Sequence, residues 1–276
     1  MTGRTRKILT AILLVVFLFS IVKFLQGQMD KSAGSSTYQD ALQMATSEKN
    51  PAAIQTVPPT GPEHAEEAKP RWIPAPVEEE DPNLQTLESI GLDSLQEAHP
   101  DVVGWILIPD TQVNYPLMQG EDNEYYLNRT WDGKNNSVGS IFLESQNSPD
   151  LTDFNTIVYG HNMMDGSMFA TVRQYGVADY WEKHPYVYIL SQEGIFRYEV
   201  FASYQAPVDS STYGLSFNQA KTRINFLTEA MDNSVISTGI VPALTDRILT
   251  LSTCSGAGYT HRWVVHARLK MIQTAS

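Results

Sequence analysis

The stretch LTLSTCSGAGYTHRWVVHAR, residues 249–268, contains two apolar segments separated by a short loop rich in glycine. Alternate residues of an extended strand share one face, so the first segment places Ser252 and Cys254 together. If the two segments pair as neighbouring strands, Cys254 at the end of the first and Arg262 at the start of the second share one rim. A guanidinium near a thiol favours the thiolate and can stabilise an oxyanion, so this rim is a candidate reactive site.

Strand-like runs, bounded by turn residues and including these two segments, fill the C-terminal two thirds of the chain and predict a mainly β domain, a barrel or a sandwich. They cover residues 102–108, 113–119, 139–144, 155–160, 186–190, 196–206, 247–253 and 262–272. Helical spacing of Ala220, Ile224, Leu227 and Met231 predicts one helix among them. Two short helical pieces precede the first strand, with Asp93 as an expected N-cap of the second.

The N-terminus predicts a membrane anchor. A basic tail at residues 1–7 precedes an apolar run at residues 8–25, which is near the lower length limit for crossing a bilayer. A cleaved signal peptide competes with an uncleaved signal anchor, and the absence of a small-x-small cleavage site after the run favours the anchor. The excess of positive charge before the run predicts a single pass through the cell membrane, with a cytoplasmic N-terminus and an extracytoplasmic remainder.

Residues 26–82 are rich in Pro, Ala, Ser and Glu and poor in aliphatic side chains, so we expect an extracytoplasmic linker there. The folded domain is then expected at residues 83–276, long enough to bury a core. A formal net charge of −12 argues against nucleic acid as a partner. The chain has no Cys/His pattern with metal-ligand spacing and no glycine-rich phosphate loop, which predicts neither a metal nor another cofactor.

Cys254 is the only cysteine of the chain, so it cannot form an intramolecular disulfide outside the cell. It is therefore buried and inert, paired between chains, or reactive. Cysteine catalysis needs an acid or base, and histidine is the usual one. The residues alone do not choose between His161, His261 and His266.

Three motifs in this order resemble those of the sortase family, and in particular its class B branch. They are YGHNMMDGSMF at residues 159–169, TLSTC at residues 250–254 and RWVVHAR at residues 262–268. The segment from Pro100 to Glu144 is also similar to class B sequences almost throughout. The resemblance covers residues from about Asn83 to Ile272. It implies a closed barrel of about eight strands, with short N-terminal helices and one helix in the long connection between the sixth and seventh strands.

The resemblance also implies roles for residues. Cys254 would be the nucleophile that cleaves a sorting signal after Thr and forms a thioacyl-enzyme. His161 would be the general acid and then the general base, and Arg262 would position the substrate and stabilise the oxyanion. The substrate groove of the family maps onto five positions: Asn123, Leu127, Thr212, Tyr213 and Ser252. No match exists to the calcium site of some class A members.

The function expected from the resemblance is a membrane-anchored cysteine transpeptidase. Its partners would be surface proteins with a C-terminal sorting signal, and its acceptor an amine of peptidoglycan or of a pilin subunit. Two alternatives remain open: a hydrolytic cysteine peptidase with the same three residues, and a non-enzymatic surface β-barrel that binds a ligand.

Overall fold

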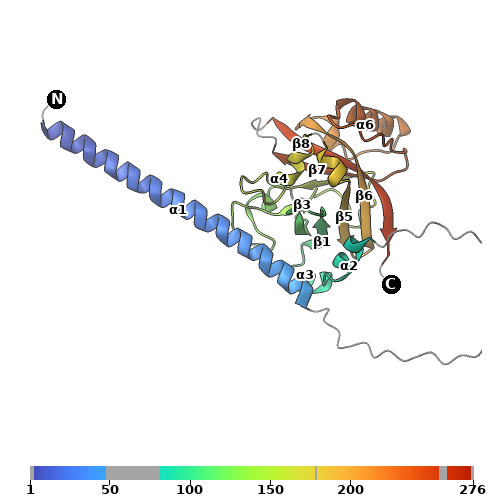
Figure 1. Cartoon of the computed structure of the whole chain (residues 1–276), viewed down its shortest axis with the longest axis horizontal. Coiled ribbons are helices and arrows are strands. Elements are labelled where there is room, and N and C mark those ends of the chain that lie inside the picture. The colour runs from blue at the N-terminus through green and yellow to red at the C-terminus, as the bar shows by residue number, and fades with distance from the viewer. Residues whose placement is uncertain (1–2, 48–80, 178, 255–259, 275–276) are drawn as a thin grey trace, which may run out of the picture.

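The computed structural model describes residues 3–47, 81–177, 179–254 and 260–274, and for residues 3–11, 47 and 254 it describes the backbone alone. Its centre is a closed barrel with the strand order β1-β2-β3-β4-β7-β8-β6-β5 (Figure 1). The strand bounds are β1 Val102–Leu107, β2 Asn114–Met118, β3 Ile141–Leu143, β4 Asn155–Tyr159, β5 Tyr186–Ser191, β6 Gly194–Pro207, β7 Ile248–Cys254 and β8 His261–Gln273. The predicted mainly β class and closed barrel are confirmed, and each predicted run coincides with one strand.

Two of the strand pairs are parallel, β2 with β3 and β4 with β7, and the other pairs are antiparallel. Pairing of β1 with β5 closes the barrel, which leaves no unpaired sheet edge. The long strands β6 and β8 pair along most of their length and form the main wall of the barrel. A helix covers this wall, so β7 and β8 bury side chains on both of their faces.

That helix is α6 (Ala220–Asn233), and it lies in the connection between β6 and β7, as predicted (Figure 1). The side chains that it buries are Phe226, Leu227 and Ala230, whereas Ile224 is exposed. The predicted apolar stripe through Ile224 is therefore partly wrong. The face of α6 that packs on the barrel includes Phe226 in place of Ile224. The ring of Phe226 packs edge-on against the rings of Phe154 and Phe217.

Smaller helices fill the connections of the barrel. Their bounds are α2 Pro82–Glu88, α3 Leu92–Ala98, η1 Tyr125–Asn128, α4 Ala170–Gln174, α5 Tyr180–Lys183 and η2 Ser211–Tyr213. The expected cap of α3 is wrong by two residues. Gly91 holds the N-cap position, and Asp93 lies in the first turn, where its Oδ1 accepts a hydrogen bond from Gln192 at 2.8 Å.

The N-terminal helix α1 (Gly3–Ser47) runs through the expected boundary between anchor and linker. It is long and apolar enough to cross a membrane, judged by length and composition, and its large apolar side chains from Ile12 to Leu25 are exposed. The helix does not end at residue 25. It continues to Ser47, and its last turns lie against the barrel beside α3 (Figure 1). The rest of the expected linker, residues 48–80, lies outside the described residues.

The docked part of α1 buries a stripe of mostly small residues. Gly34, Tyr38, Ala41 and Ala45 recur at helical spacing and are all buried. Small side chains let the helix backbone approach the barrel closely: a Cβ on Gly34 would lie 2.9 Å from Asn136 Oδ1. The helix is therefore packed against the barrel from about Asp30 onward.

Candidate active site at the ends of three strands

Three adjacent strands bring the predicted catalytic residues to one end of the barrel. β4 runs parallel to β7 with Tyr159 opposite Ser252, and the Gly160 amide continues this pairing by donating to the Ser252 carbonyl at 3.2 Å. His161 follows Gly160 directly, and so lies beside the end of β7. On the other side of β7, Cys254 is paired with Arg262 of β8. The backbone thus places His161, Cys254 and Arg262 on neighbouring strand ends.

The imidazole of His161 is held by a backbone carbonyl. Its Nε2 lies 2.6 Å from the carbonyl oxygen of Leu127, in η1. A carbonyl only accepts hydrogen bonds, so Nε2 carries a proton, and in the neutral ring Nδ1 is the basic nitrogen. This hydrogen bond defines both the tautomer and the orientation of the ring. Leu127, predicted from the resemblance to line the groove, therefore contacts His161 through its main chain.

Gly139 makes this approach possible. It has a φ of +64°, and a Cβ there would lie 2.6 Å from the Leu127 carbonyl and 2.9 Å from Cδ2 of His161. Only a residue without a side chain fits the conformation and the space. Neither the motifs nor the periodicity of the sequence identified this glycine as part of the site.

Arg262 is half-buried at the start of β8, and its Nη1 donates to the His261 carbonyl at 3.1 Å. Its neighbour Trp263 turns away, donating from Nε1 to Ser203 Oγ at 2.9 Å. Alternation along β8 therefore separates the side chain of Arg262 from that of Trp263. In the backbone register, Arg262 is the residue paired with Cys254.

A buried carboxylate organises one side of the site. Glu144 Oε2 accepts hydrogen bonds from Asn123 Nδ2 at 2.6 Å and from the Tyr159 hydroxyl at 2.9 Å. Burial, together with the nearby charge of Glu144, raises the pKa of the Tyr159 hydroxyl. Asn123, a predicted groove residue, is therefore held in one orientation, and its Oδ1 accepts from the Ser145 amide at 2.8 Å. Sequence reasoning missed Glu144, although it ends a predicted strand run.

The 3-10 turn η2 brings two more of the predicted residues to β7. The Tyr213 hydroxyl lies 3.0 Å from Ser252 Oγ, and its ring stacks on that of Tyr159 at a centroid distance of 6.4 Å. Thr212 is buried, and its hydroxyl pairs with that of Tyr204 at 2.8 Å. The structure thus brings Tyr213 and Ser252 together but turns the Thr212 hydroxyl inward.

The other two candidate histidines, His266 and His261, have different environments. His266 is fully buried, packed among the rings of Phe201, Tyr204 and Phe226, and burial lowers its pKa to about 3. A group so far from solvent has no access to a substrate. His261 begins β8 and pairs with Thr260 Oγ1 through its Nδ1 at 3.0 Å. Among the described residues, no three His, Cys, Asp or Glu side chains are grouped so that they could hold a metal ion.

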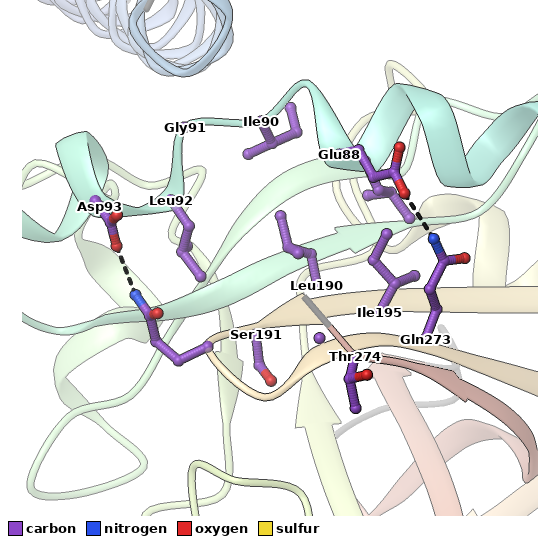
Figure 2. Close-up of a pocket in the computed structure, with 13 residues that line it drawn as sticks. Glu88, Ile90, Gly91, Leu92, Asp93, Leu190, Ser191, Ile195, Gln273 and Thr274 are labelled. Atoms are coloured by element: carbon purple, nitrogen blue, oxygen red, sulfur yellow. Dashed lines mark hydrogen bonds between the residues drawn. The ribbon is translucent and has the colours of Figure 1, made fainter. Parts of the chain in front are cut away.

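A well-formed hollow lies at another part of the molecule. It has a volume of about 710 Å³ and is formed by the connection between α2 and α3, the turn between β5 and β6 and the end of β8 (Figure 2). Two hydrogen bonds cross its sides, Asp93 with Gln192 at 2.8 Å and Glu88 with Gln273 at 2.6 Å. None of the predicted site residues lines it, so this hollow is not the candidate site at the strand ends.

Comparison with known proteins identifies the family to which the barrel belongs. A family model described as a sortase domain matches residues 106–270. Sortase B of Listeria monocytogenes is 37% identical over 163 residues, which cover 59% of this chain and 66% of that protein. Sortase B of Staphylococcus aureus is 34% identical over 179 residues, covering 64% of this chain and 73% of that protein.

Solved structures of sortase B are also similar to this chain. A Staphylococcus aureus sortase B–substrate complex superposes with a TM-score of 0.63 at 32% identity, covering 66% of this chain and 85% of that one. Sortase B from Bacillus anthracis in complex with AAEK1 superposes with a TM-score of 0.66 at 28% identity, covering 87% of this chain and 98% of that one.

Proposed function

Because the chain belongs to the sortase family, as a class B member, we propose that it is a transpeptidase that cleaves a sorting signal after Thr and transfers the carried protein to an amine. The observation that supports this most directly is the register of the strand ends. Cys254 lies opposite Arg262, and His161 follows the strand on the other side of β7. A nucleophile, an acid–base group and a cation then lie within reach of one scissile bond.

In the first half-reaction, the thiolate of Cys254 attacks the carbonyl carbon of the Thr residue. The C–N bond breaks, a thioester forms, and the leaving amine takes the proton that His161 holds on Nδ1. Arg262 is placed to stabilise the negative charge that develops on the carbonyl oxygen. The hydrogen bond from Nε2 to Leu127 keeps the reacting nitrogen of His161 turned away from the backbone.

In the second half-reaction, an acceptor amine attacks the thioester carbon. His161 takes the proton from this amine, the C–S bond breaks, and the thiolate of Cys254 is restored as an amide forms. The acceptor that we propose is an amine of peptidoglycan or of a pilin subunit. The same groups would transfer the acyl chain to water if no amine entered, which is the difference between transpeptidase and peptidase.

The groove for the sorting signal is proposed to run between η1 and η2. Asn123 and Leu127 lie on one side, and Tyr213 and Ser252 on the other. Tyr159 joins the two sides, because it bonds to Glu144 and stacks on Tyr213. Thr212 would act through the position of η2, since its hydroxyl is already paired inside.

We further propose that α1 crosses the cell membrane once, with the N-terminus in the cytoplasm. Positive charges precede the apolar run at Arg4, Arg6 and Lys7, and only Lys23 interrupts its end. The folded domain, expected at residues 83–276, would then lie outside the cell together with the docked part of α1. Substrates held at the membrane would be close to the barrel.

The proposal is tested by incubating the full chain in detergent micelles with LPxTG-, NPxTN- and SPxTG-type peptides. Mass spectrometry should detect a thioacyl adduct on Cys254, and an added amine should raise turnover and yield an amide product. Cys254→Ala should fold and form no adduct. An adduct that is only hydrolysed, whatever amine is added, would favour the peptidase, and unchanged activity of Cys254→Ala would contradict cysteine catalysis.

A further inference from the structure

The docked part of α1 contacts the loop at residues 136–140, which precedes β3. Asn136 Nδ2 donates to the Asp30 carbonyl at 2.7 Å, and Ser137 Oγ donates to Asp30 Oδ2 at 2.8 Å. Two turns further along the helix, the Tyr38 hydroxyl donates to the Gly139 carbonyl at 2.5 Å and lies 3.1 Å from Ser140 Oγ. The helix that carries the anchor therefore holds this loop at several points.

On the side that faces away from α1, the same loop lies against His161. Gly139 is so close to Leu127 and His161 that not even a methyl group would fit between them. The neighbouring Ser140 amide donates to the Tyr126 carbonyl at 2.9 Å, and Ser140 Oγ donates to the Arg129 carbonyl at 2.7 Å. These bonds fix η1, whose Leu127 carbonyl accepts from His161. A displacement of Gly139 would thus move the acceptor that orients the imidazole.

A second route leads from α1 to the segment that follows His161. The Tyr38 ring packs edge-on against Tyr115 at a centroid distance of 5.2 Å, and the Tyr115 hydroxyl accepts from the Met168 amide at 3.2 Å. Met168 is bridged to Asn162, the residue after His161. A hollow of about 280 Å³ in this region is lined by Lys31 and Asp165, among other residues. The pKa of the Asp165 carboxyl is lowered by its hydrogen bond from Ser167 and, to a smaller extent, by the charge of Lys31.

We propose that Tyr38 of α1 is a positioning residue for His161, so that the juxtamembrane half of the anchor helix is part of the active-site framework. Tyr38 acts through the Gly139 carbonyl on the Leu127 acceptor, and through Tyr115 on the segment after His161. The proposal rests on the proposed function, in which His161 is the acid and base. Its consequence is that the docked anchor contributes to catalytic rate, and not only to the location of the enzyme.

The test compares Tyr38→Phe with Ser137→Ala in the full chain in detergent micelles. Tyr38→Phe keeps the ring and removes the bond to Gly139. Ser137→Ala removes one hydroxyl bond between α1 and the same loop without touching Gly139 or His161. The rate of thioacyl formation at saturating peptide and the NMR titration of the His161 imidazole, with ¹³C-labelled histidine, are measured for both.

We expect Tyr38→Phe to lower the acylation rate about fivefold, the effect of one lost hydrogen bond of about 1 kcal/mol, with KM unchanged. The titration of His161 should shift in the same variant, and Ser137→Ala should match the unmodified chain in both measurements. Equal losses in the two variants would show that docking alone matters, and an unchanged Tyr38→Phe would refute the positioning role. If Tyr38→Phe does not fold, Ser140→Ala takes its place, with a loss of the same sign expected and an unchanged rate refuting the role.

The NMR titration separates the two proposals. An unmodified chain that forms no adduct with any peptide contradicts the proposed function, whereas the shift of the His161 titration between the variants is still measured. An active unmodified chain with no difference between the variants contradicts only the role of Tyr38.

Discussion

Cys254 and Arg262 lie directly opposite each other in the antiparallel pair of β7 and β8. Directly opposed residues of such a pair are the closest neighbours across strands, which supports the proposed role of Arg262 as the cation that stabilises the oxyanion. We expect Arg262→Lys to lower acylation by about 100-fold, because a point charge does not replace the planar donor fork. Stopped-flow or quench-flow measurement of thioacyl formation checks this. Retention of more than a third of the rate would remove Arg262 from the oxyanion role.

The second prediction concerns the pH dependence of acylation. An ordinary thiol has a pKa of about 8.5 and an ordinary imidazole one of about 6.5, whereas the reaction needs thiolate together with imidazolium. The acylation rate should therefore follow a bell-shaped pH profile. His161→Ala should lower the rate by at least about 100-fold and remove the limb to which His161 contributes. A flat profile from pH 5 to 10 in the unmodified enzyme would contradict a coupled Cys–His pair.

The third prediction uses two glycines with the same backbone conformation. Gly139 and Gly133 both have positive φ, at +64° and +76°, so alanine strains the backbone at either position. At Gly133 the nearest atom to a new Cβ is His99 Nε2 at 3.2 Å, away from the site. At Gly139 the new Cβ would displace the Leu127 carbonyl and His161. We expect a loss of at least about 1 kcal/mol in unfolding free energy for both, larger for Gly139→Ala because of this clash, and a loss of acylation above tenfold only for Gly139→Ala.

Thermal unfolding and acylation rates of both alanine variants, measured side by side, decide between strain and displacement. If the two variants lose the same activity, backbone strain alone accounts for the effect. The comparison then gives no support to the idea that Gly139 transmits the contact of α1 to His161.

The barrel was predictable from sequence because its strands are short apolar runs separated by turn residues. The docked part of α1 was not predictable from sequence, for a physical reason. Its buried stripe is Gly34, Tyr38, Ala41 and Ala45, and small residues in a polar setting give a weak apolar pattern. The gain from such a contact is close backbone approach and hydrogen bonding, which no hydropathy pattern records.

The candidate site, too, was only partly predictable from the sequence. Cys254 and Arg262 could be paired from sequence, because a short loop joins their strands and antiparallel register follows from it. His161 could not be chosen among the histidines, because its place depends on parallel pairing of β4 with β7, far apart in the chain. The family resemblance supplied that choice. Glu144 and Gly139 were missed, since a lone acidic residue and a lone glycine carry no spacing signal.

The fourth prediction concerns the groove. The hydroxyls of Tyr213 and Ser252 lie 3.0 Å apart and link η2 to β7. Tyr213→Phe and Ser252→Ala should each raise KM for the sorting peptide severalfold and change kcat little. The double variant should be no worse than either single one, with a coupling of about 1 kcal/mol in kcat/KM. Additive effects in this cycle would show that the two hydroxyls act independently.

The last prediction starts from a closed ring of hydrogen bonds around His266. Thr250 Oγ1 donates to Asn155 Oδ1 at 2.6 Å, so it accepts from Nδ1–H of His266 at 2.9 Å. The other nitrogen, Nε2, lies 3.1 Å from the Tyr204 hydroxyl, and that hydroxyl pairs with Thr212. Asn155 Nδ2 closes the ring by donating to the Thr212 carbonyl at 3.2 Å. Burial favours the neutral imidazole, and in that form Nε2 accepts a hydrogen bond from the Tyr204 hydroxyl.

Protonation of His266 therefore opposes folding. Burial lowers the pKa of His266 to about 3 in the folded protein, against 6.5 in the unfolded chain. Between these values the unfolded state holds one more proton at this residue than the folded state. The contribution of His266 to stability is thus complete above pH 6.5 and is lost as the pH falls toward 3, with a slope of up to about 1.4 kcal/mol per pH unit.

The measurement is the free energy of unfolding by urea at pH 7, 6, 5 and 4 for the unmodified chain and for His266→Gln. The glutamine variant is expected to be less stable at pH 7, because its shorter side chain does not complete the ring. Its stability should nevertheless fall less steeply with acid, since one titrating group is gone, so the curves of the two proteins converge toward pH 4. Parallel curves over this range would show that His266 does not stay neutral in the folded barrel.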